Sequence, residues 1–233
     1  MKTAITLVDL ILLVIMVGDS SLANHEEPSI QIPRGSPITL DGRVGDDEWN
    51  GALRQELSGG GEVRLMHDGA HLLVGVKGMK DGLVHICITD GKDIYVLHAS
   101  AALGTAIYRR DESDVWQPVQ PFTFGMRDKS QSQEAIAARA SYQASHGWVA
   151  TTFQMGNPGE VEFKLSAKFK QGQVMKLAVV FASPPSAGQC WPKAVSDDCL
   201  KQTLIFGQTP SNLRFTPETW ARVEMNRRSG SSK

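Results

Sequence analysis

Apolar and polar residues alternate with a period of two along much of this chain, which is the pattern of half-buried β-strands. The alternation runs over residues 62–66, turns at Asp68-Gly69 and returns over residues 71–77. A second hairpin of the same design follows over residues 84–96. Strands joined by such tight turns pair antiparallel. The pattern therefore predicts an all-β fold, an antiparallel β-sandwich.

Later segments extend the same prediction. Alternation or a continuous apolar run predicts strands over residues 148–153, 161–165 and 175–181. Residues 131–139 have helical propensity, but Ile136, Ala138, Ala140 and Tyr142 also alternate, so we predict a strand there.

The C-terminal segment differs in kind. Thr216-Pro217-Glu218 is typical of a helix start, and Trp220 and Val223 lie three residues apart. We expect a short C-terminal helix followed by a disordered tail.

The predicted organisation has four parts. Residues 1–23 form a signal peptide, 24–37 an N-terminal arm with an edge strand at 30–32, 38–207 the sandwich, and 208–233 the C-terminal helix and tail.

The prediction of export depends on the first 23 residues. Lys2 precedes a short apolar run over residues 10–17, and Ser21-Leu22-Ala23 supplies small residues for cleavage. The run is too short to span a bilayer. We therefore expect a secreted or periplasmic protein without a membrane anchor after cleavage. The chain has 24 basic and 25 acidic residues, a balance that suggests no nucleic-acid partner.

Three cysteines in an exported chain imply one disulfide and one free thiol. Cys190 and Cys199 flank a short loop that a disulfide would close, so we predict that pair. Cys87 lies in a predicted strand and is expected to be free and buried.

Residues 38–49 are the most distinctive stretch of the sequence. Asp41-Gly42 is a turn dipeptide, and Asp46 can cap one helical turn that carries Trp49. A large aromatic there is expected to belong to the structural core, as a plug closing one end of the sandwich.

Residues 38–52 and 62–76 together resemble the opening of family 9 carbohydrate-binding modules and their DOMON-like relatives. Those modules begin with a strand, Asp-Gly, an acid-acid-x-Trp step and a hairpin with Asp at its tip. Residues 159–166, 177–181 and the Trp191-Pro192 loop resemble their closing strands. The resemblance implies a non-catalytic sandwich that binds a glycan or oligosaccharide. It also makes calcium a possible cofactor.

A sugar site needs aromatic faces for the C–H faces of the rings and fixed polar groups for the hydroxyls. Two loop tryptophans have polar neighbours of this kind. The predicted carbohydrate-binding residues are Trp116, Trp191, Gln117, Gln189 and Arg127.

Other functions are also open. The sequence lacks the common motifs for nucleophilic, metal-dependent and phosphate-binding enzymes, which argues against catalysis. The first alternative is an exported structural or protein-interaction sandwich without a small ligand. The second is a DOMON-like haem protein, with Met66, His67 and His71 near one hairpin tip as candidate ligands.

Overall fold

A computed structural model describes residues 28–79, 81–89, 91–126, 132–152, 159–166, 174–183 and 188–225. The predicted signal peptide lies outside these residues. Thirteen strands make up nearly half of the described residues. They are β1 (Ile30–Ile32), β2 (Leu53–Glu56), β3 (Glu62–His67), β4 (His71–Lys77), β5 (Leu83–Thr89), β6 (Asp93–Ala99), β7 (Leu103–Arg110), β8 (Trp116–Met126), β9 (Trp148–Thr152), β10 (Glu160–Ser166), β11 (Met175–Ala182), β12 (Gln189–Trp191) and β13 (Ala221–Met225).

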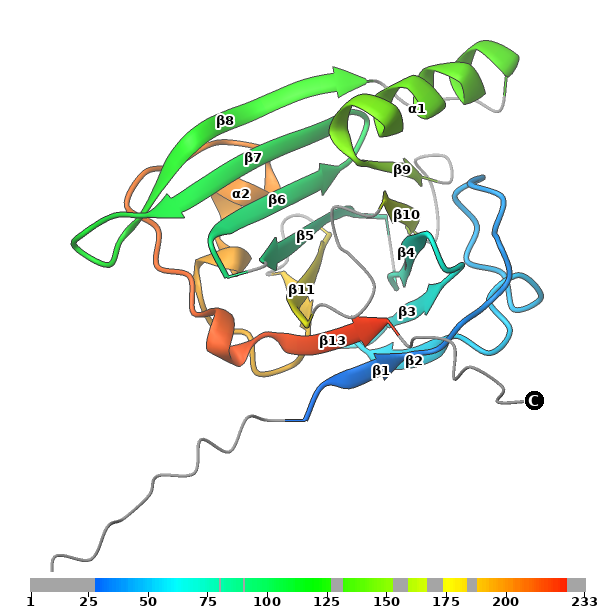
Figure 1. The fold of residues 1–233 in the computed structure, drawn as a ribbon, viewed down its shortest axis with the longest axis horizontal. Helices are drawn as coiled ribbons and strands as arrows, with labels where there is room; N and C mark the ends of the chain where they lie inside the picture. Colours follow the sequence, from blue (N-terminus) through cyan, green and yellow to red (C-terminus); the bar gives the residue numbers. More distant parts are fainter. Residues whose placement is uncertain are drawn as a thin grey trace, which may run out of the picture.

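The strands form two sheets, and the predicted all-β sandwich is confirmed (Figure 1). The eight-stranded sheet has the order β1-β13-β11-β5-β6-β7-β8, with β12 also paired to β11. The five-stranded sheet has the order β2-β3-β4-β10-β9. Almost every pairing is antiparallel, and β1 with β13 is the parallel exception.

The two sheets bury their inner faces against each other. The alternation of each strand sends one set of side chains into this core, among them Ile86, Val179, Val74 and Phe163. Trp148 links the sheets, because its indole N–H on β9 donates to Thr105 Oγ1 on β7 at 2.9 Å.

The outer face of the eight-stranded sheet has a second apolar core. Residues 190–220 cross this face with a 3₁₀ turn (Asp198–Leu200), the short helix α2 (Gln202–Ile205) and a second 3₁₀ turn (Pro217–Thr219).

The C-terminal segment corrects one prediction. The expected helix after Thr216 is wrong, since only one 3₁₀ turn forms at Pro217 before β13. Ala221, Val223 and Met225 alternate inward, and β13 pairs with both β11 and β1. The predicted edge strand at residues 30–32 is confirmed as β1. Both segments therefore belong to the sandwich.

The strand predicted over residues 136–142 is also wrong. Helix α1 (Gln133–His146) forms there, capped by the Ser132 hydroxyl and ended by Gly147 in the left-handed conformation. Arg139 and Tyr142, three residues apart, are buried. The helix covers the end of the sandwich near β9 and β8 (Figure 1).

The predicted disulfide between Cys190 and Cys199 is wrong as well. Cys199 is bonded to Cys87, with 6.4 Å between their Cα atoms, and Cys190 is the free, buried thiol. The reason is the two-residue period of β5: Ile86 and Ile88 face the inner core, so Cys87 faces outward. Asp197 caps the 3₁₀ turn that lays Cys199 on that outer face.

The described residues include no helix of the length and apolar character needed to cross a membrane.

Candidate functional site

The two tryptophans predicted to stack on sugars do not form an exposed platform. Trp116 begins β8 and Trp191 ends β12, and each side chain is 4% exposed. Trp116 belongs to the outer core of the eight-stranded sheet, whereas Trp191 belongs to the core between the sheets. The structure therefore separates the two rings and covers their faces.

Their polar neighbours are engaged in structural contacts. The Gln117 amide donates to Asn212 Oδ1 at 2.7 Å, and the Gln189 amide donates to the Gly59 carbonyl at 3.2 Å. The Trp191 N–H donates to Gln55 Oε1. Arg127 lies outside the described residues. These contacts hold loops and strand ends together.

Exposed aromatic side chains lie elsewhere, at one end of the outer face of the eight-stranded sheet. Phe124 on β8 and Phe206 after α2 are 48% and 49% exposed. They line a hollow of about 590 Å³ together with His98, Ser100 and Met126, which we call the aromatic hollow. Phe206 comes from the segment that covers the face, so the hollow lies between the sheet and that segment.

Two glycines allow Phe124 to lie in this position. The β-sheet register aligns His98, Gly104 and Phe124 across β6, β7 and β8. A Cβ atom at Gly104 or Gly207 would approach the Phe124 ring within 2.7 Å or 2.6 Å. The Phe124 ring therefore occupies the space that side chains at positions 104 and 207 would fill. Its orientation is fixed by stacking on Phe122 at 5.7 Å between centroids.

The polar part of the aromatic hollow is His98 with Ser100. The His98 side chain is 3% exposed, and its Nε2 lies 3.0 Å from Ser100 Oγ. Burial lowers the pKa of His98 to about 4, so the ring is neutral at pH 7. His98 Nδ1 is buried without a hydrogen-bond partner in the part of the chain that is described.

The His98–Ser100 contact also has the shape of a base beside a nucleophile. In hydrolases a third group, usually a carboxylate, orients the imidazole through its other nitrogen. None of the described residues does so for His98. Ser100 Oγ is also within 3.4 Å of both backbone polar groups of Ala102. The described residues therefore do not complete a catalytic triad at His98.

Sequence reasoning missed the aromatic hollow for a definable reason. Phe122 and Phe124 alternate on one strand, a pattern that usually means core. Gly104 opposite Phe124 was the available signal, since glycine inside a strand often marks the close approach of another group.

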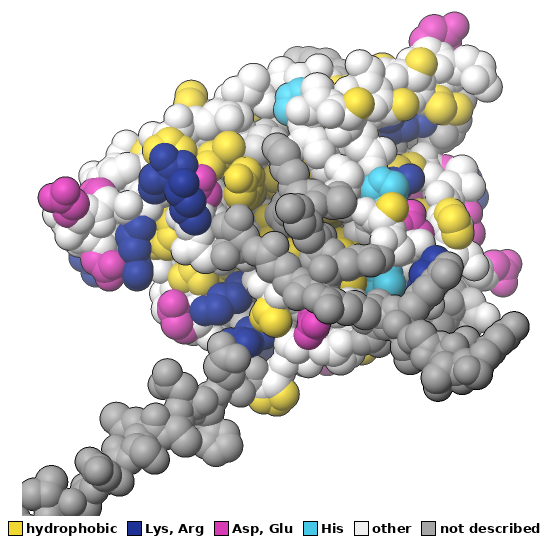
Figure 2. Space-filling view, viewed as in Figure 1, with side chains coloured by type: hydrophobic (Ala, Val, Ile, Leu, Met, Phe, Trp, Pro, Cys, Tyr) yellow, Lys and Arg dark blue, Asp and Glu magenta, His cyan; other side chains and the backbone are white. Residues whose placement is uncertain are grey.

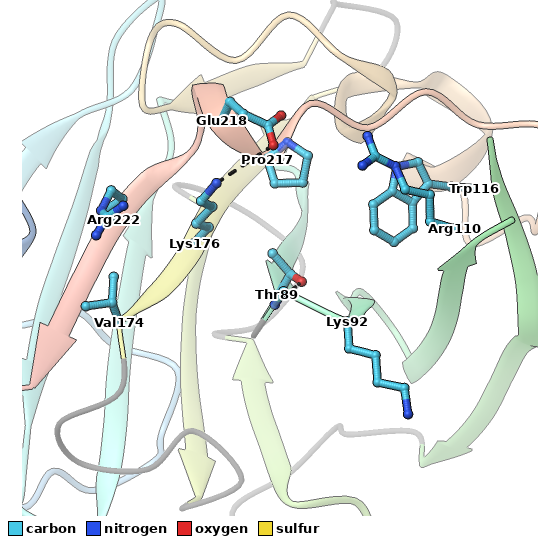
Figure 3. A pocket seen from close by; sticks show the side chains of 10 residues that line it. Thr89, Lys92, Arg110, Trp116, Val174, Lys176, Pro217, Glu218 and Arg222 are labelled. Carbon is cyan, nitrogen blue, oxygen red and sulfur yellow. Dashed lines mark hydrogen bonds and ion pairs between the residues drawn. The ribbon is translucent and has the colours of Figure 1, made fainter. Parts of the chain in front are cut away.

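The opposite end of the same face carries a hollow of different chemistry (Figure 3). It has a volume of about 330 Å³, and we call it the basic hollow. Four of its described lining residues are cationic and one is acidic. They are Lys92, Arg110, Lys176, Arg222 and Glu218. Trp116 and Thr89 also line this hollow. Figure 2 shows Lys and Arg side chains gathered on the left of the view, near the ends of β7 and β13.

Three carboxylates converge on the outer face of the five-stranded sheet. Ligand atoms of Asp41, Glu48 and Glu162 lie within 4.8 Å of one another. Oxygen ligands of this kind are what Ca²⁺ prefers. Both Glu162 oxygens, however, accept N–H groups, from Asp41, Gly42 and Trp49. These hydrogen bonds explain the cluster as the anchor of a turn, and calcium stays a prediction of the family resemblance.

The candidate haem ligands do not face a common space. Met66 packs in the small cluster around Trp49, and His67, its neighbour on β3, is also buried. His71 Nδ1 is 2.9 Å from Asp68 Oδ2 at the hairpin tip. This geometry does not fit an axial pair for haem.

No protein-family model matches the chain, and no curated protein matches it either. Two solved structures are similar. One is a carbohydrate binding module of family 9 from Caldicellulosiruptor kristjanssonii in complex with cellotriose, at 14% identity and a TM-score of 0.47, covering 88% of this chain and 97% of that one. The other is a candidate carbohydrate-binding protein from Bacteroides uniformis, at 12% identity and a TM-score of 0.45, covering 85% and 99%. Both likenesses are distant.

Proposed function

We propose that this chain is an exported, non-catalytic glycan-binding protein that holds a saccharide in the aromatic hollow. The observation that carries the proposal is the pair of half-exposed rings, Phe124 and Phe206, beside the buried His98 and the half-buried Ser100. A sugar presents C–H faces to aromatic rings and hydroxyls to fixed polar atoms, and this hollow has both.

Three further features support a saccharide as the ligand, export of the protein, and binding without catalysis. The resemblance of residues 38–52 to the opening of family 9 modules is the reason for choosing a saccharide among small ligands. The disulfide between Cys87 and Cys199 is typical of proteins outside the reducing cytosol and supports export. The incomplete His98–Ser100 arrangement supports binding without catalysis.

A glycan array, with and without calcium, followed by calorimetry on the best soluble oligosaccharide tests the proposal. Phe124→Ala and Phe206→Ala should each weaken binding roughly 5- to 150-fold, by analogy with the 1–3 kcal/mol of base–aromatic stacking. The matched control is Ile136→Ala, which removes a half-exposed apolar side chain on α1, outside the hollow.

Two results would contradict the proposal. One is the absence of binding by the unmodified protein to every glycan on the array. The other is unchanged affinity in both phenylalanine variants. The first would favour the alternative of a structural or protein-interaction sandwich, in which the same rings contact a protein.

A further inference from the structure

Asn50-Gly51 is the single Asn-Gly pair in the sequence, and it lies in the turn that follows Trp49. The backbone N–H of Ala52 donates to the Trp49 carbonyl at 3.1 Å, which closes a tight turn around the pair. Gly51 has a φ of 81°, the conformation that the third residue of a type II turn requires. The turn leads directly into β2, which begins at Leu53.

Both amides of this pair are accessible to solvent and to each other. Asn50 and Gly51 are exposed, and a Cβ atom added at Gly51 would have no neighbour within 4 Å. In a tight turn the N–H of the third residue lies outside the closing hydrogen bond. Among the described residues, none accepts a hydrogen bond from the Gly51 N–H, and none bonds the Asn50 side-chain amide.

These two amides can react with each other. When the Gly51 amide loses its proton to hydroxide, its nitrogen can attack Cγ of Asn50 and form a five-membered succinimide ring. The C–N bond of the side-chain amide breaks, and ammonia leaves. Groups held together in one chain react as if at high concentration, and glycine has no Cβ to hinder the approach. Water then opens the ring, giving aspartate at the side-chain carbonyl or isoaspartate at the backbone carbonyl.

We infer that Asn50 is a modification site of the folded protein, which water converts to aspartate and isoaspartate through this succinimide. The net reaction exchanges one amide nitrogen for one oxygen and releases ammonia. It adds one negative charge to a turn that already contains Asp46 and Asp47. No cofactor or second protein is needed.

Comparable pairs elsewhere are protected by the fold. The N–H of Gly42, which follows Asp41, donates to Glu162 Oε2 at 2.8 Å, so this nitrogen is engaged. Asn212 is followed by Leu213, whose N–H donates to a backbone carbonyl of β8 at 3.0 Å. The side chain of leucine also crowds its own amide. Asn50 therefore differs from both in having a free, unhindered amide as its neighbour.

Isoaspartate should alter this turn more than aspartate does. It routes the backbone through the side chain and adds one CH₂ group between Trp49 and Gly51. The ring closed by the Ala52 N–H and the Trp49 carbonyl is then too long, whereas aspartate keeps the backbone and adds only a charge. Because this turn joins the buried Trp49 to β2, isoaspartate should weaken the packing of the indole.

Incubation of the folded protein at mildly alkaline pH in heavy-oxygen water, followed by peptide mapping, tests the inference. Heavy oxygen enters the new carboxyl group, which distinguishes conversion during incubation from conversion during digestion. We expect Asn50 to be converted about tenfold faster than Asn212 or more. Equal conversion at the two positions overturns the inference. So does conversion of Asn50 in urea but not in the folded protein, because the fold then protects it.

The matched control variant is Asn50→Gln, which keeps an amide but would have to close a larger, less favourable ring. Isoelectric focusing should show an acidic species growing in the unmodified protein and not in this variant. Equal growth in both would assign the change to another residue and overturn the inference.

The consequence for the turn is measured by urea unfolding of the chromatographically purified isoaspartate form. It should unfold at a lower urea concentration than Asn50→Asp, which carries the same charge on an unaltered backbone. Equal midpoints would overturn the link between the modification and the packing of Trp49. No residue of this turn lines the aromatic hollow, so these results do not depend on the proposed function.

Discussion

The indole N–H of Trp49 donates to Glu162 Oε1 at 3.0 Å, which joins the most distinctive stretch of the sequence to the middle of the five-stranded sheet. Both side chains are fully buried. Trp49 lies on the outer face of this sheet, over Gly75, where an added Cβ would approach the ring within 3.0 Å. The ring is therefore a core residue as expected, but it covers a sheet face and does not close the end of the sandwich.

Two substitutions of Trp49 distinguish how much packing and how much hydrogen bonding contribute to the stability of the fold. Trp49→Ala should lower the free energy of unfolding by about 3–5 kcal/mol, since it empties a buried aromatic site. Trp49→Phe keeps much of the packing but removes one donor from the buried Glu162, at a cost of about 1–3 kcal/mol. Urea unfolding of the three proteins measures both. A Trp49→Phe variant as stable as the unmodified protein would mean that the hydrogen bond contributes nothing.

Glu162 should make stability fall as pH rises. Burial is the main cause that raises its pKa to about 7, and the neighbouring Asp41 and Glu48 charges act in the same direction. The hydrogen bonds from Gly42 and Trp49 lower the pKa and offset part of this effect. The folded state thus holds a proton that the unfolded state releases near pH 4.5. The stabilisation that Glu162 contributes to the folded state is complete below pH 4.5 and is lost as the pH rises to about 7.

The measurement for Glu162 is a comparison with Glu162→Gln, which cannot titrate. The difference in unfolding free energy between the two proteins should change by about 2–4 kcal/mol across this window. A difference that stays constant with pH would contradict the raised pKa.

His98 should make stability fall as the pH falls, which is opposite to the effect of Glu162. Burial lowers its pKa to about 4, so the unfolded state binds a proton between pH 6.5 and that value while the folded state does not. Stability should therefore fall as the solution is acidified through this range, by about 2–4 kcal/mol for this one residue. His98→Phe should remove that part of the acid sensitivity. Melting temperatures from pH 7 to pH 4 test the difference.

The disulfide is open to direct mapping. Peptide mapping without reduction should recover Cys87 linked to Cys199 and Cys190 as a thiol. Because the bond closes 112 residues, its loss in Cys199→Ser should destabilise the fold by about 4–5 kcal/mol in the chain-entropy model. Cys190→Ser is the control and should leave the linkage intact. Recovery of a Cys190–Cys199 peptide would contradict the structure.

The buried Trp191 should matter for stability and not for ligand contact. Trp191→Ala is expected to cost about 3–5 kcal/mol of folding free energy, because the ring packs between the sheets and its N–H bonds Gln55. Glycan affinity of the folded fraction should remain unchanged, in contrast with Phe206→Ala. A large loss of affinity with unaltered stability would place the sugar at Trp191 after all.

The sequence by itself determined the strands and their hairpins. Alternation with a period of two needs only neighbouring residues, and turns such as Asp68-Gly69 are local, so the β-sandwich could be predicted. The same local rule assigned Ile86 and Ile88 to one face and so already placed Cys87 on the other. The burial of Trp49 followed from its size and its place in a short turn.

Only the tertiary structure decided which face of each strand is covered, and by what. Residues 190–220 lie on the outer face of a sheet formed mainly by residues 83–126, and this distant contact pairs Cys199 with Cys87 and buries Trp116. The same contact leaves Phe124 exposed at one end of the face and Lys176 beside Arg222 at the other. The alternation of residues in a strand indicates which side chains share a face. Whether that face is exposed to solvent depends on segments about a hundred residues away in the chain.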